Sequence, residues 1–452
     1  MMKSGIALRK PSDILMISGF DENFNRWFQT AQARTHRPLR SGTAARENNE
    51  RGMTMKITSI DVFDFSKCLN YEDCAPVCIR INTDAGISGF GEVGLAYGNA
   101  HNAGVWIVKD FGQLIIGMDP LNSEAIREKL FRTTFWGMGG GTVINAGMSA
   151  IDIALWDIKG KYYNAPVYQL LGGKTNHKLR AYASQIQFDW DLEDRNMVTP
   201  EQYAEAAKKA MAQGYTAVKV DPVGVAANGN WQRTRQDADW RLRGQMPKHV
   251  LEMVRARLKA IRDLSDSLDI IIELHAFTDT STAIQLANYI DDLNIMYYEE
   301  PVHPLNAVSM REIRDKINIP VASGERIYTR LGYRPFFENR SLSVIQPDVC
   351  LCGGISETKK ICDMADAYDV KVQVHVCGGP ISQAAALHVE TVIPNFLIHE
   401  QHSYGIKEGL RRTCVYDYLP DDHGDLVVPE LPGIGQEITE ETMKKTWVYT
   451  VQ

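Results

Sequence analysis

Short β-rich runs alternate with helical segments along most of this chain, and that alternation restricts its fold more than any other feature. Eight such runs occur from Leu179 onward, most of them separated by segments with helical spacing, such as SETKKICDMADAYD. Strict alternation of strand and helix indicates a parallel sheet, and eight repeats predict a closed barrel. The runs are RAYASQ, AVKVDP, IIIELHA, IMYYEEP, PVASGE, LSVIQPD, KVQVHV and FLIHEQ.

A polar residue stands at the end of six of these runs, and consecutive members are 23 to 27 residues apart, about one strand–helix unit. Barrel active sites form where strands end, so side chains with this period should meet in one opening. A single glutamate at a strand end is usually a solvated loop residue, and the prediction depends on the shared phase of all six. They are Glu273, Glu299, Glu325, Asp348, His375 and Glu400.

The charge gathered in this way predicts a bound cation. Two carboxylates 4 Å apart repel by about 4 kcal/mol at an effective dielectric constant near 20, and three together would cost roughly 12 kcal/mol. A cation between them removes this cost, and oxygen ligands suit a hard divalent ion such as Mg²⁺.

Glu273 and His275 end a run that opens with three Ile residues. Residues i and i+2 of a strand point to the same face. We therefore expect both side chains in the barrel opening and Leu274 against the surrounding helices.

Composition excludes several classes of protein. A net charge of −7 and a pI near 5.9 argue against a nucleic-acid partner, and no run of 18 apolar residues is present to span a membrane. Eight Cys in 452 residues do not form a disulfide framework. Cys350 and Cys352 are too close together for a zinc knuckle, and with Cys362 and Cys377 they are interpreted as buried free thiols, which favours a cytoplasmic protein.

Three regions are predicted. Residues 1–54 are rich in Arg and lack apolar periodicity, so we expect a poorly ordered extension. Residues 55–178 show strands followed by helices and predict an α+β capping domain, completed by about 406–452, where LVVPELPGIGQEI returns to it. Residues 179–405 form the (β/α)8-type barrel, a modified TIM barrel.

The order and spacing of YYEEP, ASGERI, IQPDVCLCGGISE and FLIHEQ resemble the enolase superfamily, in its mandelate racemase and muconate-lactonising branch. The segment IDIALWDIKGKYYNAPVYQLLGG is similar to the one that leads from the capping domain into the barrel in that branch. The resemblance begins near residue 55 and implies a Mg²⁺-dependent enzyme that removes the proton α to a carboxylate. By motif, the metal ligands are Glu273, Glu299 and Glu325; the first is usually Asp in the family.

The resemblance also bears on the catalytic base. The second strand of the racemases carries Lys-x-Lys or Lys-x-His, whereas VKVDP has Lys219 followed by Asp221. A racemase of that type therefore lacks one partner. Lys219 either faces the substrate carboxylate or is a buried strand lysine neutralised by Asp221. His375 is the stronger candidate for the base, because Asp348 ends the preceding strand and can fix its tautomer.

The Glu-x-His pair formed by Glu273 and His275 resembles the acid-sugar dehydratases, especially the D-galactonate dehydratase-like group. It implies that Mg²⁺ chelates the carboxylate and α-hydroxyl of a sugar acid, His375 takes the α-proton, and His275 protonates the leaving 3-hydroxyl. The enol product then becomes a 2-keto-3-deoxy acid. Glu400 either hydrogen-bonds the enediolate oxygen or is a rim residue.

Other functions stay open from the sequence alone. An epimerase or cycloisomerase on the same scaffold is the first alternative, and a non-catalytic sugar-acid binding protein is the second. The long segment GVAANGNWQRTRQDADWRLRGQMPKH and cap loops containing Tyr71 and Tyr97 are expected to border the site. The arginines of the long segment would contact the sugar acid or a neighbouring subunit, or belong to a solvated flap. The expected partner is a small sugar acid, with neither nucleic acid nor membrane, and the resemblance implies a homo-oligomer, an octamer or dimer.

Overall fold

Eight parallel strands form the larger sheet in the part of the chain that the computed structural model describes, residues 55–69, 74–190, 195–231 and 242–452. The strand order is β10-β9-β8-β7-β6-β5-β4-β11. A parallel bridge between Val372 and Phe396 connects the two ends, where the Val372 N–H donates to Asn395 (2.9 Å) and the Leu397 N–H to Val372 (2.8 Å). The strands are β4 (Leu179–Ser184), β5 (Ala217–Val220), β6 (Asp269–Glu273), β7 (Ile295–Glu299), β8 (Val321–Ser323), β9 (Val344–Ile345), β10 (Lys371–Val372) and β11 (His399–His402).

The predicted barrel is therefore confirmed, and side-chain alternation divides its core into two layers. Along β6, Ile270 and Ile272 face outward into the large core between sheet and helices, whereas Ile271 packs in the barrel interior with Tyr182 and Tyr297. Leu274 belongs to the outer core, as the alternation predicts. Glu273 follows the inward phase of Ile271.

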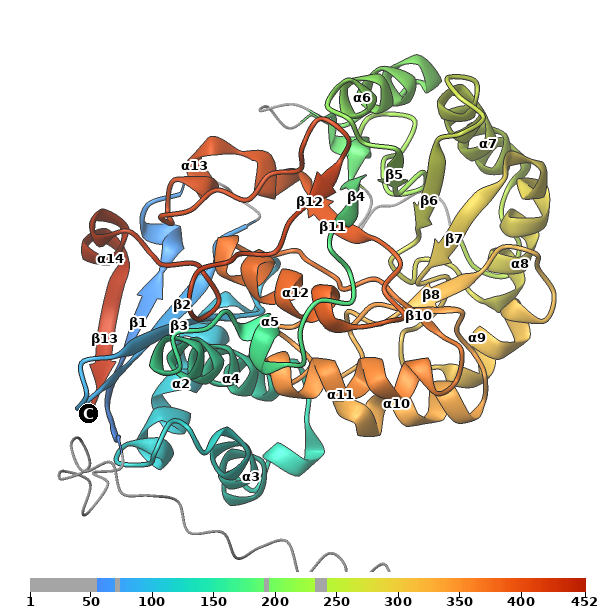
Figure 1. Cartoon of the computed structure of the whole chain (residues 1–452). Coiled ribbons are helices and arrows are strands. Elements are labelled where there is room, and N and C mark those ends of the chain that lie inside the picture. The colour runs from blue at the N-terminus through green and yellow to red at the C-terminus, as the bar shows by residue number, and fades with distance from the viewer. Residues whose placement is uncertain (1–54, 70–73, 191–194, 232–241) are drawn as a thin grey trace, which may run out of the picture. The chain divides into compact units, whose positions relative to one another are not determined.

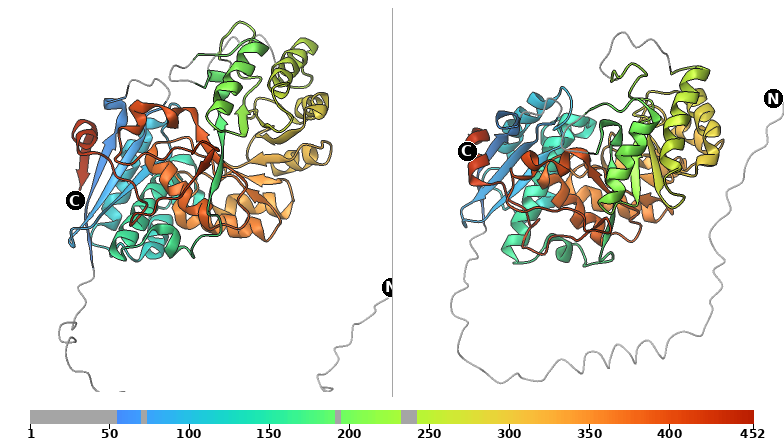
Figure 2. Two further views of the ribbon diagram at one scale, coloured as in Figure 1. Left: turned by 45° about the horizontal axis from the view of Figure 1, so that its top comes forward. Right: turned by 90° about the horizontal axis from the view of Figure 1, so that it is seen from above.

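Helices between the strands cover the outside of the barrel (Figures 1 and 2). Local sequence sets where several begin. The Thr199 side chain accepts a hydrogen bond from the Gln202 N–H, and Pro200 occupies the first helical position of α6, where its missing N–H is not needed. The helices are α6 (Pro200–Ala212), α7 (Lys248–Arg262), α8 (Thr280–Tyr289), α9 (Ala307–Arg314), α10 (Thr329–Glu338), α11 (Gly354–Asp366) and α12 (Pro380–Val392).

A second, four-stranded antiparallel sheet has the order β13-β1-β2-β3; three of its strands precede the barrel in the chain and β13 follows it. Its strands are β1 (Ile57–Asp64), β2 (Val77–Thr83), β3 (Ser88–Val93) and β13 (Trp447–Val451), and the helices of this region are α2 (His101–Ile115), α3 (Ser123–Thr133), α4 (Thr142–Tyr162) and α5 (Val167–Leu170). Gly89 and Gly91 let β3 approach α4 closely, because a Cβ at either would lie 2.2 or 1.9 Å from a backbone oxygen of α4.

The end of the chain returns to this region, as predicted. β13 pairs with β1, so the antiparallel sheet contains both ends of the described chain (Figure 1). The Ile434 N–H donates to Asp157 of α4 (2.9 Å). The same terminal part also adds β12 (Asp425–Leu426) to β4 and contains the short helices α13 (Glu408–Arg411) and α14 (Glu440–Thr446). The domain boundaries stay a prediction.

Buried hydrogen bonds attach the antiparallel sheet and α4 to the barrel helices. Asp152 of α4 accepts from the Ser356 N–H (2.9 Å) and hydroxyl (2.6 Å) of α11. Glu92 of β3 accepts from the N–H groups of Gly379 (2.6 Å) and Ser382 (3.0 Å) at the start of α12. These contacts hold the capping region against the sixth and seventh strand–helix units of the barrel.

The structure tests the prediction for the cysteines but does not describe the predicted N-terminal extension. All eight Cys are free thiols, and six are buried, but Cys68 and Cys377 are half-buried, so the prediction of a buried thiol is wrong for Cys377. The predicted extension 1–54 and Tyr71 lie outside the described residues. Among the described residues, no helix has the length and apolar character needed to cross a membrane.

Glu92 predicts a pH-dependent stability. Burial raises its pKa to about 7 from 4.5, although two backbone N–H groups oppose the shift. Between these pH values the folded protein holds a proton that the unfolded chain has released, so stability falls as pH rises from about 4.5 to 7, by at most about 1.4 kcal/mol per pH unit. Glu92→Gln should give a lower but flatter profile in thermal unfolding between pH 4.5 and 7.5.

The exposed Glu205→Gln serves as the matched control and should leave the slope unchanged. An unchanged slope in Glu92→Gln would contradict this assignment.

Candidate metal centre and catalytic site

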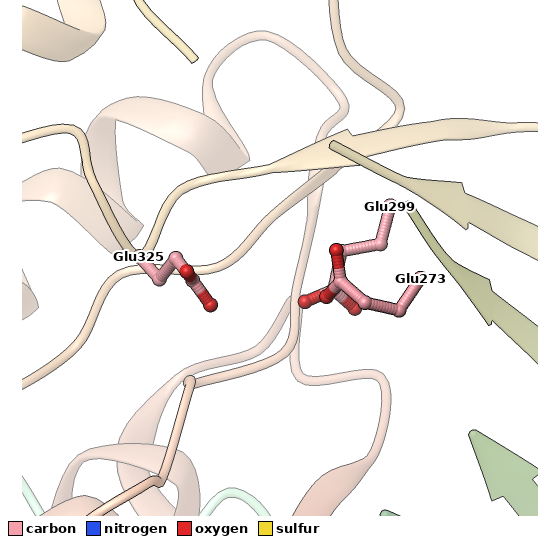
Figure 3. Close-up of side chains that lie close together, drawn as sticks. All are labelled: Glu273, Glu299 and Glu325. Carbon is pink, nitrogen blue, oxygen red and sulfur yellow. The ribbon is translucent and has the colours of Figure 1, made fainter. Parts of the chain in front are cut away.

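Three glutamates from successive strand–helix units converge on one point at the carboxyl ends of the barrel strands. Glu273 and Glu299 are the last residues of the neighbouring strands β6 and β7, and Glu325 follows β8 and faces them (Figure 3). One carboxylate oxygen from each lies within 4.8 Å of the other two. The polar residues that recur along the sequence therefore meet at this edge of the barrel.

This cluster has the properties of a cation site. Glu273 and Glu299 are buried, and Glu273 Oε2 accepts no hydrogen bond from the described residues. Burial and the neighbouring Glu299 raise the pKa of Glu273 well above its usual value. A divalent ion would give this oxygen a partner and offset the repulsion among the three carboxylates, which offer the oxygen ligands that hard ions prefer. The donor set fits such an ion.

Lys219 lies beneath the glutamate cluster rather than in the open site. Its Nζ is 2.8 Å from Glu400 Oε1, 3.1 Å from Glu299 Oε1 and 3.9 Å from Glu273 Oε2. Burial alone would lower its pKa, but Glu299 and Glu400 raise it well above the usual value. The alternative in which Asp221 neutralises Lys219 is therefore wrong.

Glu400 shares this buried position. It is the second residue of β11, and its carboxylate also accepts from the Ser184 hydroxyl (2.6 Å) and the Val376 N–H (3.0 Å). The alternative of a rim residue is wrong, because the side chain is buried. Neither Glu400 nor Lys219 is among the residues lining the cavity above the cluster.

His375 and Asp348 form the hydrogen-bonded pair expected from the sequence. His375 Nδ1 lies 2.7 Å from Asp348 Oδ2, and a parallel bridge joins the two residues. His375 Nε2 lies 3.0 Å from Glu325 Oε2, which places the ring at the edge of the metal cluster. Burial would lower the pKa of His375, but Glu325, Glu400 and Asp348 raise it well above its usual value.

His275 reaches the site by a turn and not along the strand. β6 ends at Glu273, and His275 has a left-handed backbone with φ of 48°, so the expected strand alternation does not extend to it. The Glu273 side chain accepts the His275 N–H (2.5 Å), which stabilises this turn. His275 Nδ1 lies 2.8 Å from Asp221 Oδ2. Left-handed non-glycine residues cost free energy and gather at functional sites.

A cavity of about 240 Å³ opens above the glutamates, and both histidines line it together with Glu325 and Asp348. Sequence reasoning expected the long segment that carries Trp231 to border the site, but it did not name this residue and missed several others. Trp231 stands edge-on to His275, with ring centroids 6.4 Å apart, and packs at a tilt against Phe188 at 4.8 Å. The missed residues include Gln185, Arg326, Tyr328, His402 and Tyr404.

The sequence contains a signal from which some of these residues could have been predicted. His402 has the same phase as Glu400 in the run HEQH, and Arg326 directly follows Glu325. Burial lowers the pKa of His402 to about 3, so this ring is neutral at physiological pH. Trp231 and Phe188 follow no period, because loops carry them.

The capping region closes one side of the cavity. Tyr97 lines it, as proposed for the cap loops, and Thr142 at the start of α4 hydrogen-bonds Tyr328 of the barrel (2.7 Å). Most of the arginines in the long segment after Asp221, among them Arg233, Arg235 and Arg241, lie outside the described residues. Trp231, from the same segment, borders the cavity.

Comparisons with known proteins agree with this architecture. Residues 70–172 match the family described as mandelate racemase / muconate lactonizing enzyme, N-terminal domain, and residues 202–442 match the enolase C-terminal domain-like family. The chain is 32% identical to D-xylonate dehydratase of Haloferax volcanii, covering 79% of this chain and 82% of that protein. It is also 32% identical to D-galactonate dehydratase of Variovorax paradoxus, covering 80% and 88%.

A solved structure gives a stronger likeness. An enolase superfamily member from Salmonella Typhimurium is 56% identical, with a TM-score of 0.83 over 88% of this chain and all of that one. The family resemblance of the sequence motifs is thereby confirmed. With its capping region, its parallel barrel and its three converging glutamates, the chain belongs to the enolase superfamily, in the mandelate racemase and muconate lactonizing enzyme family.

Proposed function

We propose that the protein is a Mg²⁺-dependent sugar-acid dehydratase. The observation that carries this proposal is the placement in one cavity of His275, two residues after Glu273, and His375, two strands beyond Glu325 in the strand order. Removal of a proton from one carbon and protonation of an oxygen leaving the next require two such groups. Relatives named D-xylonate and D-galactonate dehydratase support the reaction and a monoacid sugar as substrate.

The residues that would hold Mg²⁺ are Glu273, Glu299 and Glu325. Bound there, Mg²⁺ would supply positive charge to offset the negative charge that develops on the substrate carboxylate as the α-proton leaves. Lys219 and Glu400 support this cluster from below, so we assign them positioning roles. Burial and fixed hydrogen bonds keep their charges in place before substrate arrives.

His375 is the proposed base. Its Nδ1 is engaged by Asp348, so Nε2 is the atom that takes the α-proton from the substrate. The electrons of the C–H bond form the new C=C bond, and the C3–O bond breaks. His275, with a proton on each ring nitrogen, gives its Nε2 proton to the departing hydroxyl and keeps the Nδ1 proton, and water leaves. The enol that remains ketonises to a 2-keto-3-deoxy acid.

An epimerase on the same scaffold is the second candidate, and the pairing of each histidine with an aspartate favours it. Two bases of similar construction can in principle remove a proton from one face and return it to the other. Deuterium incorporation at the α-carbon without water loss would identify this reaction.

Screening sugar acids with Mg²⁺ tests the main proposal. We expect formation of a 2-keto-3-deoxy acid from at least one acid in a panel that includes D-xylonate, D-gluconate and D-galactonate. No keto-deoxy product from any mono- or diacid sugar would contradict the proposed reaction.

Replacement of His375 tests its role as base. His375→Asn should lower kcat by about 10²- to 10⁴-fold, since general base catalysis contributes that much. Substrate affinity, measured by calorimetry, should change little. The exposed His249→Asn is the control and should keep full activity. Equal turnover in His375→Asn and the wild type would refute the assignment.

Metal binding can be measured without turnover. Mn²⁺, a spectroscopic substitute for Mg²⁺, should raise the unfolding temperature of the wild type, because a ligand at 100 times its Kd stabilises the folded state by about 2.7 kcal/mol. Glu273→Gln should remove this gain. In the absence of metal the same variant should be about as stable as the wild type, because the raised pKa of Glu273 favours the neutral carboxyl that Gln reproduces, and the Gln oxygen keeps the hydrogen bond from the His275 N–H.

The exposed Glu338→Gln is the matched control for the metal experiment and should respond to Mn²⁺ like the wild type. An undiminished Mn²⁺ response in Glu273→Gln would show that the ion binds elsewhere.

A further inference from the structure

The site contains two histidine–aspartate pairs built in the same way on different strands. Asp348 follows β9 and holds His375 of the next strand unit, with Oδ2 2.7 Å from Nδ1. Asp221 follows β5 and holds His275 of the next strand unit, with Oδ2 2.8 Å from Nδ1. In both pairs the aspartate stands one parallel strand before its histidine and engages Nδ1; the Nε2 of His375 lies 3.0 Å from Glu325 Oε2.

Asp221 is fixed in an orientation that suits this contact. Its side chain is fully buried, and its Oδ1 accepts from the N–H groups of Val223 (3.1 Å) and Gly224 (2.6 Å). Its own N–H donates to Gln187 (3.1 Å). With Oδ1 engaged by two backbone donors, Oδ2 is the oxygen directed at His275. A carboxylate only accepts, so the proton of this bond lies on His275 Nδ1.

Glu273 is the other carboxylate near this ring, and it makes the weaker contact. Glu273 Oε1 is 3.8 Å from His275 Nδ1, beyond hydrogen-bond distance, and it accepts the main-chain N–H of His275 instead. Asp221 therefore sets the tautomer and orientation of the ring, while Glu273 sets the backbone turn.

We propose that Asp221 is the positioning residue for His275 and so serves the water-loss half of the reaction, as Asp348 serves the proton-abstraction half. This inference rests on the proposed dehydratase function. It gives Asp221, which directly follows β5, a role: it orients a group on the neighbouring strand unit. The two halves of the reaction then depend on different aspartates.

The variant Asp221→Asn should separate proton abstraction from water loss. Asn keeps the shape of the side chain and an oxygen for Val223 and Gly224, but directs an N–H donor at His275 Nδ1. Nδ1 must then accept this bond instead of donating it, so the neutral ring carries its proton on Nε2, the reverse of the native tautomer. An aspartate-to-asparagine change that reverses a tautomer lowers catalysis without loss of the fold.

The kinetic test is run in ²H₂O with Mg²⁺ on whichever of D-xylonate, D-gluconate and D-galactonate the wild type converts. Asp221→Asn should retain α-proton exchange within about 10-fold and lose keto-deoxy product formation by about 10²-fold or more. His275→Gln should show the same separation. The matched variant Asp348→Asn should lose exchange and product together. Equal losses of exchange and product in Asp221→Asn would overturn the proposal.

The tautomer itself gives a readout that needs no turnover. In ¹⁵N-histidine-labelled protein, with the His275 signals assigned by their loss in His275→Gln, the wild type should show His275 protonated at Nδ1. Asp221→Asn should shift that proton to Nε2. An unchanged pattern would overturn the positioning role. A shifted tautomer, with no sugar acid converted by the wild type, would instead support the positioning role and refute the proposed function.

Discussion

The concentration of negative charge at the carboxyl ends of the barrel strands is the constraint on which the rest of the site depends. Glu273, Glu299 and Glu400 gather around the ammonium group of Lys219, and Glu325 joins Glu273 and Glu299 in the cluster above it. Lys219 contacts Glu299 and Glu400 closely and Glu273 only at 3.9 Å, so it does not neutralise the cluster. A bound cation would balance the remaining charge, and we propose Glu273, Glu299 and Glu325 as the residues that would hold it.

The barrel supplies this arrangement because its parallel strands end at one edge. Asp221, His275, Glu299, Glu325, Asp348 and His375 come from successive strand units. The loops after the strands then direct side chains into the site that strand alternation alone would not place there. Left-handed residues follow three strands of this edge, at Gln185, His275 and Glu300, and that strain persists only because the surrounding hydrogen bonds over-determine it.

Much of this could be predicted from the sequence. The eight strands, the inward glutamates and the pairing of His375 with Asp348 all follow from period and phase, which a parallel barrel converts directly into position. Strand alternation correctly predicted that His275 lies in the site, but the side chain reaches it through a turn after β6 and not along the strand. One of the two alternatives for Lys219, its neutralisation by Asp221, was wrong, because Asp221 is near in sequence whereas Glu400 is near only after the barrel closes. Trp231 and Phe188 lie on loops, where no periodicity constrains a side chain.

The central claim is that one divalent ion is shared by three glutamates at the barrel edge. A crystal of the protein soaked in Mn²⁺ tests it most directly, by anomalous scattering. We predict a single strong peak about 2 Å from a carboxylate oxygen of each of Glu273, Glu299 and Glu325. No peak at this position, or a peak coordinated by other residues, would contradict the account.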